Sequence, residues 1–367
     1  MNQRITSLQA VAIIVNTILP SSILFIPSYV IHISGQDGWI SILLSVAAAL
    51  LLAFVIGSIC LQNNRTPLLD FLAGRFGKFV STVIGLVMCG YYFITTVTVV
   101  RHFADYMSEQ ILMMTPLLLL VSIIVLVSVY MASQGIEVMA RVHFIVFVFV
   151  LLFVGLNVLL LGGQYDFSQF LPVFDSTPIR LAVSGFMPLG WLSEIAALLL
   201  LLPYLEKASS ARGIAIWGTL ISGILISVIT AVTIAVFGTK IIGAMSYPAF
   251  AAIGTIEIGQ FVERVDVLLL SAWTASMFAK VSVSMFVFFH LVSDTFKIKA
   301  HPALYLAGGA LVVAMALYSW PSSVAVVKYS YSTLTIFFLL NNYAVSLLIW
   351  CGLRLTRHKA KTGEAGV

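Results

Sequence analysis

The chain has 367 residues, of which 61% are hydrophobic and only 9% are charged, and its formal net charge is +5. A soluble domain carries about 25% charged residues, so this composition excludes a water-soluble globule and indicates a protein embedded in lipid. The basic residues stand in ones and twos beside apolar runs, which argues against a nucleic-acid-binding patch and is typical of loops between membrane spans.

Ten apolar runs predict the membrane spans, because about 20 residues of helix cross the hydrocarbon core of a bilayer. Backbone groups cannot stay unpaired in lipid, so each run must be helical. The first run follows a single arginine and is too long for the core of a signal peptide, so it is interpreted as a span. The predicted spans are 8–31, 39–61, 79–100, 111–132, 142–161, 181–202, 213–237, 267–292, 303–320 and 329–352.

The positions of lysine and arginine test this number of spans. With the N-terminus inside, 13 of the 19 basic residues lie on the inner side, namely Arg4, Arg65, Arg75, Lys78, Arg141, Lys207, Arg212, Lys297, Lys299, Arg354, Arg357, Lys359 and Lys361. The outer segments hold Arg101, Arg180, Lys240, Arg264 and Lys328, and Lys280 lies within a span. Since cytoplasmic loops are enriched in basic residues, this bias predicts a multi-pass protein of the cell membrane with both termini in the cytoplasm.

Three connections are expected to be more than turns. Residues 66–76 begin with a Thr-Pro pair and carry apolar residues at helical spacing, so we expect a helix along the cytoplasmic surface. Residues 162–180 hold two glycines and two prolines and predict an ordered outer loop. Residues 238–266 are expected to form short helices that cover the outer face.

Ten spans suggest two repeats of five helices with opposite orientations in the membrane. Residues 1–367 then form a single transmembrane domain, with a first repeat at 5–161, a second repeat at 180–352 and a cytoplasmic tail at 353–367. Transporters built in this way bind their substrate where the first helix of each repeat is interrupted, near the bilayer midplane. Spans one and six are therefore the places where the sequence predicts a binding site.

Span one carries a proline and several hydroxyl residues halfway along its length. Pro20 has no backbone N–H, and its ring clashes with the carbonyl four residues earlier, so a break in the helix is predicted here. The candidate ligand-binding residues at this break are Thr17, Leu19, Pro20, Ser21 and Ser22.

Span six carries two glycines, a proline and a glutamate near its middle, which predicts a second break at the matching position. Its candidate ligand-binding residues are Phe186, Gly190, Trp191 and Glu194. Freed backbone groups at two such breaks are ligands for the carboxylate and the ammonium of a small zwitterion. The alternative is that Pro20 and Pro188 only kink helices that pack against their neighbours.

Two ionisable residues lie deep inside predicted spans. Glu194 and Lys280 each cost at least about 2.5–3.5 kcal/mol at the bilayer centre unless they are paired or wetted, so we expect both to face the interior of the helix bundle. They pair with each other, with a ligand, or with backbone at the breaks; the alternative role is a buried ion pair that only fixes helix packing. Trp273 and Ser276 share one helical face with Lys280, and all three are candidate ligand-binding residues.

The remaining candidates are weaker. Tyr91 lies in the middle of span three, where it either caps the site or packs as an aromatic residue. Arg101 and Asp105 are an i, i+4 pair at the outer end of that span, and we expect them to be solvated. The sequence shows no metal-ligand spacing, phosphate loop or nucleophile elbow, so we expect no metal, no cofactor, no catalytic residue and no enzymatic activity.

Four stretches carry a resemblance to a known family: Ile23–Pro27, Asp37–Ile40, Glu263–Asp266 with the following Trp273, and Tyr318–Pro321. Glu194 with Pro203 nine residues later adds a span-six pattern. Together they resemble the B-subunit family of bacterial spore germinant receptors, the endospore germination permeases of the amino acid–polyamine–organocation superfamily. At the span-one break this family usually has glycines, whereas this chain has Leu19-Pro20-Ser21-Ser22.

The resemblance implies an all-α, LeuT-like fold of ten transmembrane helices in a 5+5 inverted repeat, with broken first and sixth helices. It implies a subunit in the spore inner membrane that senses a small-molecule germinant, commonly an amino acid, sugar or nucleoside, together with a larger membrane A subunit and a lipoprotein C subunit. Two alternatives stay open: a proton-coupled secondary transporter of amino acids or other small solutes, and a passive structural or ion-conducting subunit.

Overall fold

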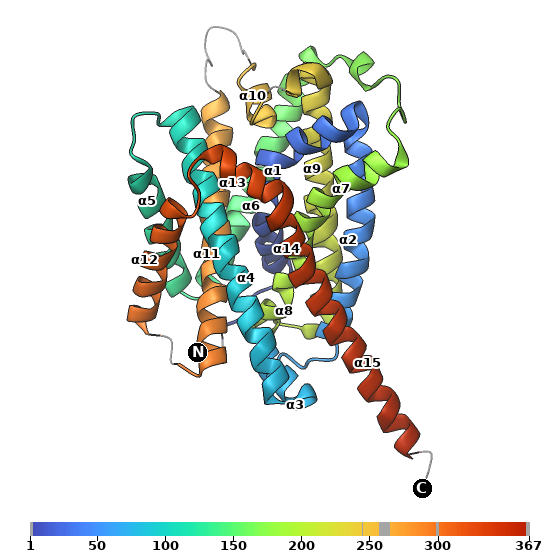
Figure 1. Cartoon of the computed structure of the whole chain (residues 1–367), viewed down its shortest axis with the longest axis vertical. Helices are drawn as coiled ribbons and strands as arrows, with labels where there is room; N and C mark the ends of the chain where they lie inside the picture. The colour runs from blue at the N-terminus through green and yellow to red at the C-terminus, as the bar shows by residue number, and fades with distance from the viewer. Residues whose placement is uncertain (1–2, 244, 257–264, 299–300, 365–367) are drawn as a thin grey trace.

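The structure is a computed structural model that describes residues 3–243, 245–256, 265–298 and 301–364. It is a bundle of helices, shown in Figure 1. The long helices are α1 (Ser7–Ser34), α2 (Gly38–Cys60), α4 (Lys78–Tyr106), α5 (Leu117–Ser133), α6 (Ile136–Leu160), α7 (Pro178–Leu192), α9 (Ala211–Ile242), α11 (Val265–Phe296), α12 (Pro302–Tyr318) and α15 (Val345–Glu364). The short helices are α3 (Leu68–Phe76), α8 (Leu198–Leu201), α10 (Pro248–Ile253), α13 (Ser323–Tyr329) and α14 (Thr335–Leu339).

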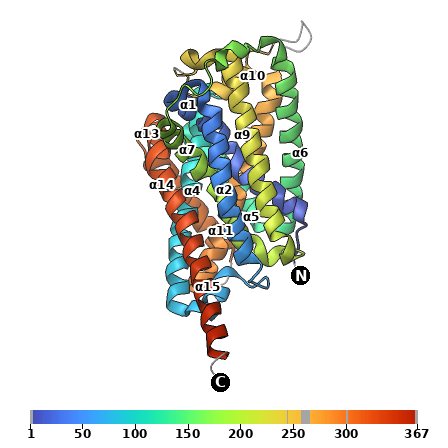
Figure 2. The ribbon, with the colours of Figure 1, turned by 90° about the vertical axis from the view of Figure 1, so that its right-hand side faces the viewer.

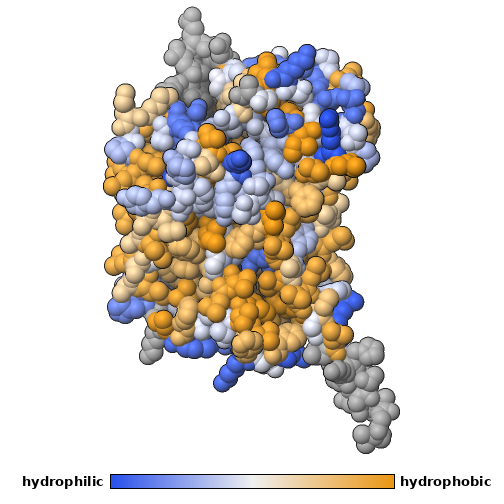
Figure 3. All heavy atoms as spheres, viewed as in Figure 1, coloured by the Kyte–Doolittle hydropathy of each residue, from blue (hydrophilic) through white to orange (hydrophobic). Residues whose placement is uncertain are grey.

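Hydropathy placed the helices correctly. Seven helical stretches of the described chain are long and apolar enough to cross a membrane, and the first of them, Ser7–Cys60, contains both α1 and α2. Two shorter apolar helices, α5 and α12, stand beside them. Each of the ten predicted runs falls on one of these helical stretches. On the face that Figure 3 shows, apolar residues form a broad band, and hydrophilic residues gather toward the two ends of the molecule, as in a multi-pass membrane protein.

Both chain ends lie at the end of the bundle that holds α3, and α10 lies at the opposite end (Figure 1). The predicted helix at 66–76 is therefore present as α3, and α10 is one of the short helices predicted within 238–266. Of the stretch Glu263–Asp266, which contributes to the family resemblance, residues 263 and 264 lie outside the described residues. Helix α15 projects beyond the bundle at the end where the chain terminates (Figure 2).

Helix α1 is the centre of the bundle and packs against α6, α7, α9 and α11. Its approach to α9 is close because α9 has glycine at the contact: a Cβ on Gly218 would lie 2.7 Å from Ile14 Cγ2. On its other side α9 packs along α2, where Gly223 meets Val46, and Figure 2 shows the two helices side by side. Small residues at such contacts allow membrane helices to approach closely, since packing rather than hydrophobicity drives their association.

The outer loop at 162–180 is tied to the turn between α1 and α2. The carboxylate of Asp37 is buried and accepts hydrogen bonds from the backbone N–H groups of Phe174 (2.9 Å) and Ser176 (2.8 Å). The two hydrogen bonds compensate the buried charge of Asp37 and also give partners to two N–H groups of the loop. They explain why an aspartate stands in the stretch Asp37–Ile40. The ordered outer loop predicted from the sequence is thus held by a residue of another connection.

The predicted break in span one is not present. α1 runs as one helix from Ser7 to Ser34, with Pro20 inside it. Its hydroxyls bond back to their own helix: Thr17 donates to the Ile13 carbonyl (2.8 Å) and Ser22 to the Ile18 carbonyl (2.7 Å). These side chains use their polar atoms locally, as hydroxyl residues commonly do in membrane helices, and they open no backbone for a ligand.

The interruption of span six lies further along the chain than predicted. α7 continues through Pro188 to Leu192, and the backbone then tightens into a 3₁₀ segment at Ser193–Ala197 before α8 begins. The tight segment contains Glu194. The two halves therefore do not carry matching breaks, because only the second half changes its helical geometry near the centre of the bundle.

Candidate functional site

Glu194 and Lys280 form an ion pair inside the bundle. Lys280 Nζ lies 2.7 Å from Glu194 Oε2, and the two side chains are 0% and 4% exposed, respectively. The ammonium also lies 4.7 Å from the centre of the Trp191 ring, in a cation–π contact. Of the partners considered from the sequence, the two residues choose each other, and the charge of each is neutralised within the protein.

A polar network borders this pair and ties three spans together. Asn342 donates through Nδ2 to the Tyr91 hydroxyl and to Ser193 Oγ, both at 2.9 Å. Asn342 lies in a π-helical segment, Leu340–Ala344, whose wider turn faces Tyr91 of α4 and the tight segment of span six. The sequence analysis missed this residue; the pair Asn341-Asn342 in the middle of an apolar run was the available signal.

His102 is a second residue that the sequence analysis missed. Its Nε2 lies 2.8 Å from Ser330 Oγ, and its ring packs 4.5 Å from the ring of Phe25 on α1, centre to centre. The ring of Trp191 is 6.4 Å away, so His102 stands between α1 and the ion pair. The predicted span three ends at residue 100, so His102 was counted outside it, whereas α4 continues as a helix to Tyr106.

Arg101 and Asp105 are buried, which corrects the expectation of a solvated pair. Arg101 Nε donates to Asp105 Oδ1 at 2.7 Å, and its Nη1 donates to carbonyls of Ala316, Leu317 and Trp320 at 3.0–3.3 Å. The guanidinium thus caps the carbonyl end of α12, where helices leave acceptors unpaired. This role accounts for the arginine and relates it to the stretch Tyr318–Pro321.

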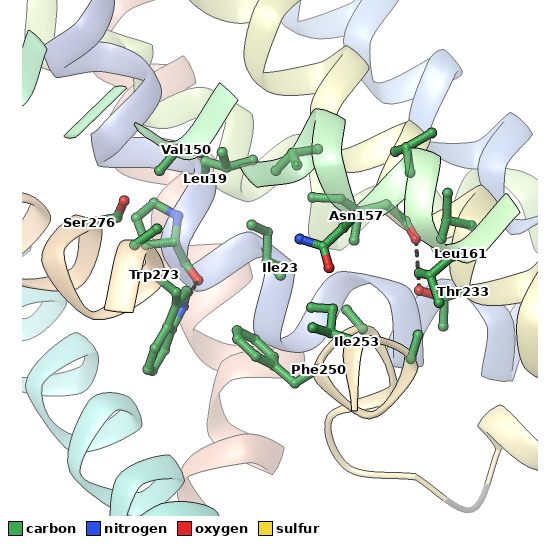
Figure 4. Close-up of a pocket in the computed structure, with 18 residues that line it drawn as sticks. Leu19, Ile23, Val150, Asn157, Leu161, Thr233, Phe250, Ile253, Trp273 and Ser276 are labelled. Carbon is green, nitrogen blue, oxygen red and sulfur yellow. Dashed lines mark hydrogen bonds between the residues drawn. The ribbon is translucent and has the colours of Figure 1, made fainter. Parts of the chain in front are cut away.

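A narrow apolar cavity opens between α1, α6, α9, α10 and α11, and we call it the α1–α11 cavity (Figure 4). The cavity is small: about 60 Å³ is open to the centre of a water-sized sphere, and the surrounding empty space, which includes the part open to the outside, is about 670 Å³. Four predicted site residues line it: Leu19, Pro20, Trp273 and Ser276. The other residues that line the cavity are Ile23, Val150, Val154, Asn157, Val158, Leu161, Ile229, Val232, Thr233, Ala249, Phe250, Ala252, Ile253 and Ala272.

One hydrogen bond joins the two principal walls of this cavity. The indole Nε1 of Trp273 donates to the Pro20 carbonyl at 2.9 Å, so α11 is fixed to the middle of α1. Ser276 follows on the same face of α11, and Lys280 lies one turn further along that helix. The cavity and the ion pair therefore share α11 and lie about one helical turn apart along it.

Some of the remaining predicted site residues gather around the ion pair, and the others lie elsewhere. Trp191, Glu194, Lys280 and Tyr91 gather around the ion pair, while Gly190 packs against α14, where a Cβ would lie 3.0 Å from Thr335 Cγ2. Ser21 is buried, and its hydroxyl has no partner among the described residues. Phe186 is wrongly predicted, because its side chain is 52% exposed on the outside of α7.

Comparison with known proteins places the chain in a family and a fold. Solved structures share the fold: MhsT in complex with L-phenylalanine has a TM-score of 0.68 at 11% identity and covers 93% of this chain and 88% of its own. A Na⁺-coupled sialic acid symporter has a TM-score of 0.64 at 15% identity, covering 93% of this chain and 79% of its own. At these identities the likeness concerns the fold alone, which is that of LeuT-type transporters.

Relatives of similar length are spore germination proteins. Spore germination protein KB of Bacillus subtilis (strain 168) is 25% identical over 305 residues, which cover 81% of this chain and 80% of the relative. Spore germination protein A2 of the same organism is 21% identical over 315 residues, covering 83% and 84%. Residues 4–324 match the family described as "Spore germination protein". This chain belongs to the spore germination protein family.

Proposed function

We propose that this protein is the membrane B subunit of a germinant receptor in the spore inner membrane, which binds a small-molecule germinant in the α1–α11 cavity. It crosses the bilayer ten times as a 5+5 repeat with both termini in the cytoplasm. It passes the binding signal to a larger membrane A subunit and a lipoprotein C subunit.

The observation that supports this proposal most directly is the position of the cavity. Its walls include the middle of α1, the central helix, and the face of α11 that also carries Lys280. A ligand that separates or draws together Pro20 and Trp273 changes the one hydrogen bond that joins these walls. A molecule that prefers one arrangement of α1 and α11 over another shifts the population of receptor states, which is what signalling requires.

The ion pair of Glu194 and Lys280 keeps α11 and span six in one arrangement while other helices change position. The ion pair between Lys280 and Glu194 joins α11 to the tight segment of span six. The polar network of Asn342, Tyr91 and Ser193 continues this contact to α4. We propose that this side of the bundle stays in place while the cavity side responds to ligand.

The test uses spores in which the native chain is replaced by a variant. Val154→Phe places a ring in the cavity, whereas Leu152→Phe, on the same helix, adds the ring at a position that is 64% exposed. We expect Val154→Phe to abolish the response to germinant and Leu152→Phe to keep it, with equal amounts of both proteins in the spore membrane. Equal germination of the two strains would overturn the proposal.

A proton-coupled transporter is the second candidate, and the transporter fold together with the buried carboxyl of Glu194 favours it. The purified protein in liposomes separates the two functions. Saturable binding without uptake supports the receptor, while uptake driven by a pH gradient identifies a transporter.

A further inference from the structure

The α1–α11 cavity carries no charge and has few hydrogen-bonding groups. Asn157, Thr233 and Ser276 are the polar side chains among the described residues that line it, and none of the lining residues is charged. In Figure 4 Ser276 lies near one end with Leu19, and Asn157 lies toward the other end with Leu161. Ile23 and Phe250 stand between them, so the middle of the cavity is apolar.

Apart from the hydroxyl of Ser276, the side-chain N–H and O–H donors that line the cavity are already in use. Trp273 Nε1 donates to the Pro20 carbonyl, and Asn157 Nδ2 donates to the Phe153 carbonyl of its own helix at 2.6 Å. Thr233 donates to the Ile229 carbonyl at 2.7 Å. Because α1 is continuous, its backbone N–H groups at this level are committed to the helix, and Pro20 has none. A carboxylate in this cavity would therefore find almost no donors.

The charged groups nearby do not compensate for this lack. Glu194 and Lys280 neutralise each other at 2.7 Å and do not line the cavity. Moving a carboxylate or an ammonium out of water without a partner is strongly unfavourable, and a zwitterion carries both charges. The cavity thus selects against the ionic groups of a free amino acid.

Two polar atoms on the lining remain without a partner among the described residues, Asn157 Oδ1 and Ser276 Oγ. Figure 4 shows the amide of Asn157 pointing from α6 into the cavity toward Ile23. Oδ1 is an acceptor, so it is satisfied by an O–H or N–H of a ligand. The Ser276 hydroxyl both donates and accepts, and it can complete a second contact.

We propose that the α1–α11 cavity binds a small uncharged molecule with a mainly apolar body and one hydrogen-bond donor, which Asn157 Oδ1 accepts. The inference rests on the proposed function, because it assigns the ligand class of the same site. It separates the ligand from the amino acid zwitterions that a LeuT-like fold suggests.

A matched series of probes tests the ligand class on the full-length chain in nanodiscs. 3-Methylbutan-1-ol, 3-methylbutanoate, 3-methylbutylammonium and leucine carry the same branched group with a neutral, anionic, cationic or zwitterionic head. We expect the alcohol to bind in ligand-observed NMR, and each charged probe to bind at least about 100-fold more weakly. Binding of leucine or another charged probe as tight as that of the alcohol would overturn the proposal.

Two variants separate the cavity from simple partition into lipid. Val154→Phe fills the cavity and should remove the specific alcohol signal, whereas Leu152→Phe on the lipid side of α6 should keep it. An alcohol signal that is the same in both variants shows partition alone and contradicts the proposal.

Asn157→Leu tests the hydrogen bond without filling the space, and it remains informative if Val154→Phe fails to fold. We expect it to weaken the alcohol about 2- to 10-fold and to leave 1-methoxy-3-methylbutane, which has no donor, unchanged. Equal weakening of both probes would remove the role assigned to Asn157.

The outcomes also distinguish this inference from the proposed function. Leucine binding that Val154→Phe abolishes would overturn the ligand class and leave the receptor site in place. Absence of binding by every probe, together with normal germination of Val154→Phe spores, would overturn both.

Discussion

Two successive turns on one face of α11 lie in opposite environments, which we call the filled side (around Lys280) and the cavity side (around Ser276). Around Lys280 the interior is charged and filled: the ammonium contacts Glu194 and the ring of Trp191, and the amide of Asn342 donates to Tyr91 and Ser193 nearby. One turn away, around Ser276, the interior is uncharged and partly empty, and polar atoms lack partners. A network whose polar groups are paired stabilises one arrangement of the helices, while an empty apolar space can be occupied by another molecule.

This difference indicates that two parts of α11 have separate roles: the part around Lys280 holds neighbouring helices together, and the part around Ser276 lines a cavity. Transporters built from inverted repeats bind their substrates near the bilayer midplane, where the repeats meet, and in this chain the buried pair of Lys280 and Glu194 lies inside the bundle. The space that remains lies nearer α10 and is bounded by α6 and α9. Substitutions that change one of these two sides at a time test this difference.

The largest effect is expected from breaking the ion pair. Lys280→Met leaves Glu194 charged and unpartnered, which should lower the stability of the protein by about 3–5 kcal/mol. The double variant Glu194→Leu/Lys280→Met removes both charges and should recover most of this loss. Thermal unfolding in detergent, with the yield of monodisperse protein, measures both.

The same double variant separates a scaffold from an active charge pair. If the pair only holds the helices, spores with the double variant respond to germinant. If the variant is stable and its spores do not respond, the pair takes part in signalling. The proposal that the filled side only holds the helices in place is then wrong.

A smaller effect is expected from the polar network. Asn342→Leu deprives the Tyr91 hydroxyl and Ser193 Oγ of a donor, and we expect a loss of about 1–3 kcal/mol. Leu340→Ala is a matched control in the same π-helical segment, because Leu340 is 61% exposed. Comparable destabilisation by the two changes would mean that the network adds little to the filled side.

The sequence predicted the helices because lipid leaves the chain so little choice. Runs of apolar residues had to be helical, and each of the ten overlaps a helix, although residues 112–116 of the run 111–132 are not helical. It also identified Glu194 and Lys280 as interior residues, since charge inside a bilayer is costly. That they bind each other depends on how the tight segment Ser193–Ala197 approaches α11, which no local pattern shows.

The prediction of an open break in α1 was wrong because contacts with distant residues decide how the polar groups of this helix are used. Pro20 suggested an open break, but Thr17 and Ser22 bond back to their own helix and Trp273 comes from a helix 253 residues away to take the Pro20 carbonyl. Asn157 was missed for the opposite reason. It sits alone in an apolar span, and only the positions of α9 and α10 show that it faces a cavity.

On the cavity side, Trp273→Phe is expected to cost about 1 kcal/mol, because it removes one hydrogen bond while keeping an aromatic ring. The ring contacts with Phe103 and Tyr106 remain, so the protein should still fold. We expect a shift in the germinant concentration needed for half-maximal response, since α1 and α11 lose their link at the cavity. An unchanged concentration would show that this link does not report ligand binding.

The smallest effect is expected from Ser276→Ala, and it compares the two sides most directly. Ser276 Oγ has no partner among the described residues, so its removal should change stability by less than about 0.5 kcal/mol. Ser193→Ala makes the same change on the filled side, where the hydroxyl donates to the Gly190 carbonyl and accepts from Asn342, and it should cost about 1 kcal/mol or more. Thermal unfolding of the two variants side by side measures the difference. If Ser276→Ala is the more destabilising, its hydroxyl is already satisfied, and the cavity is less free for a ligand than its unpaired atoms indicate.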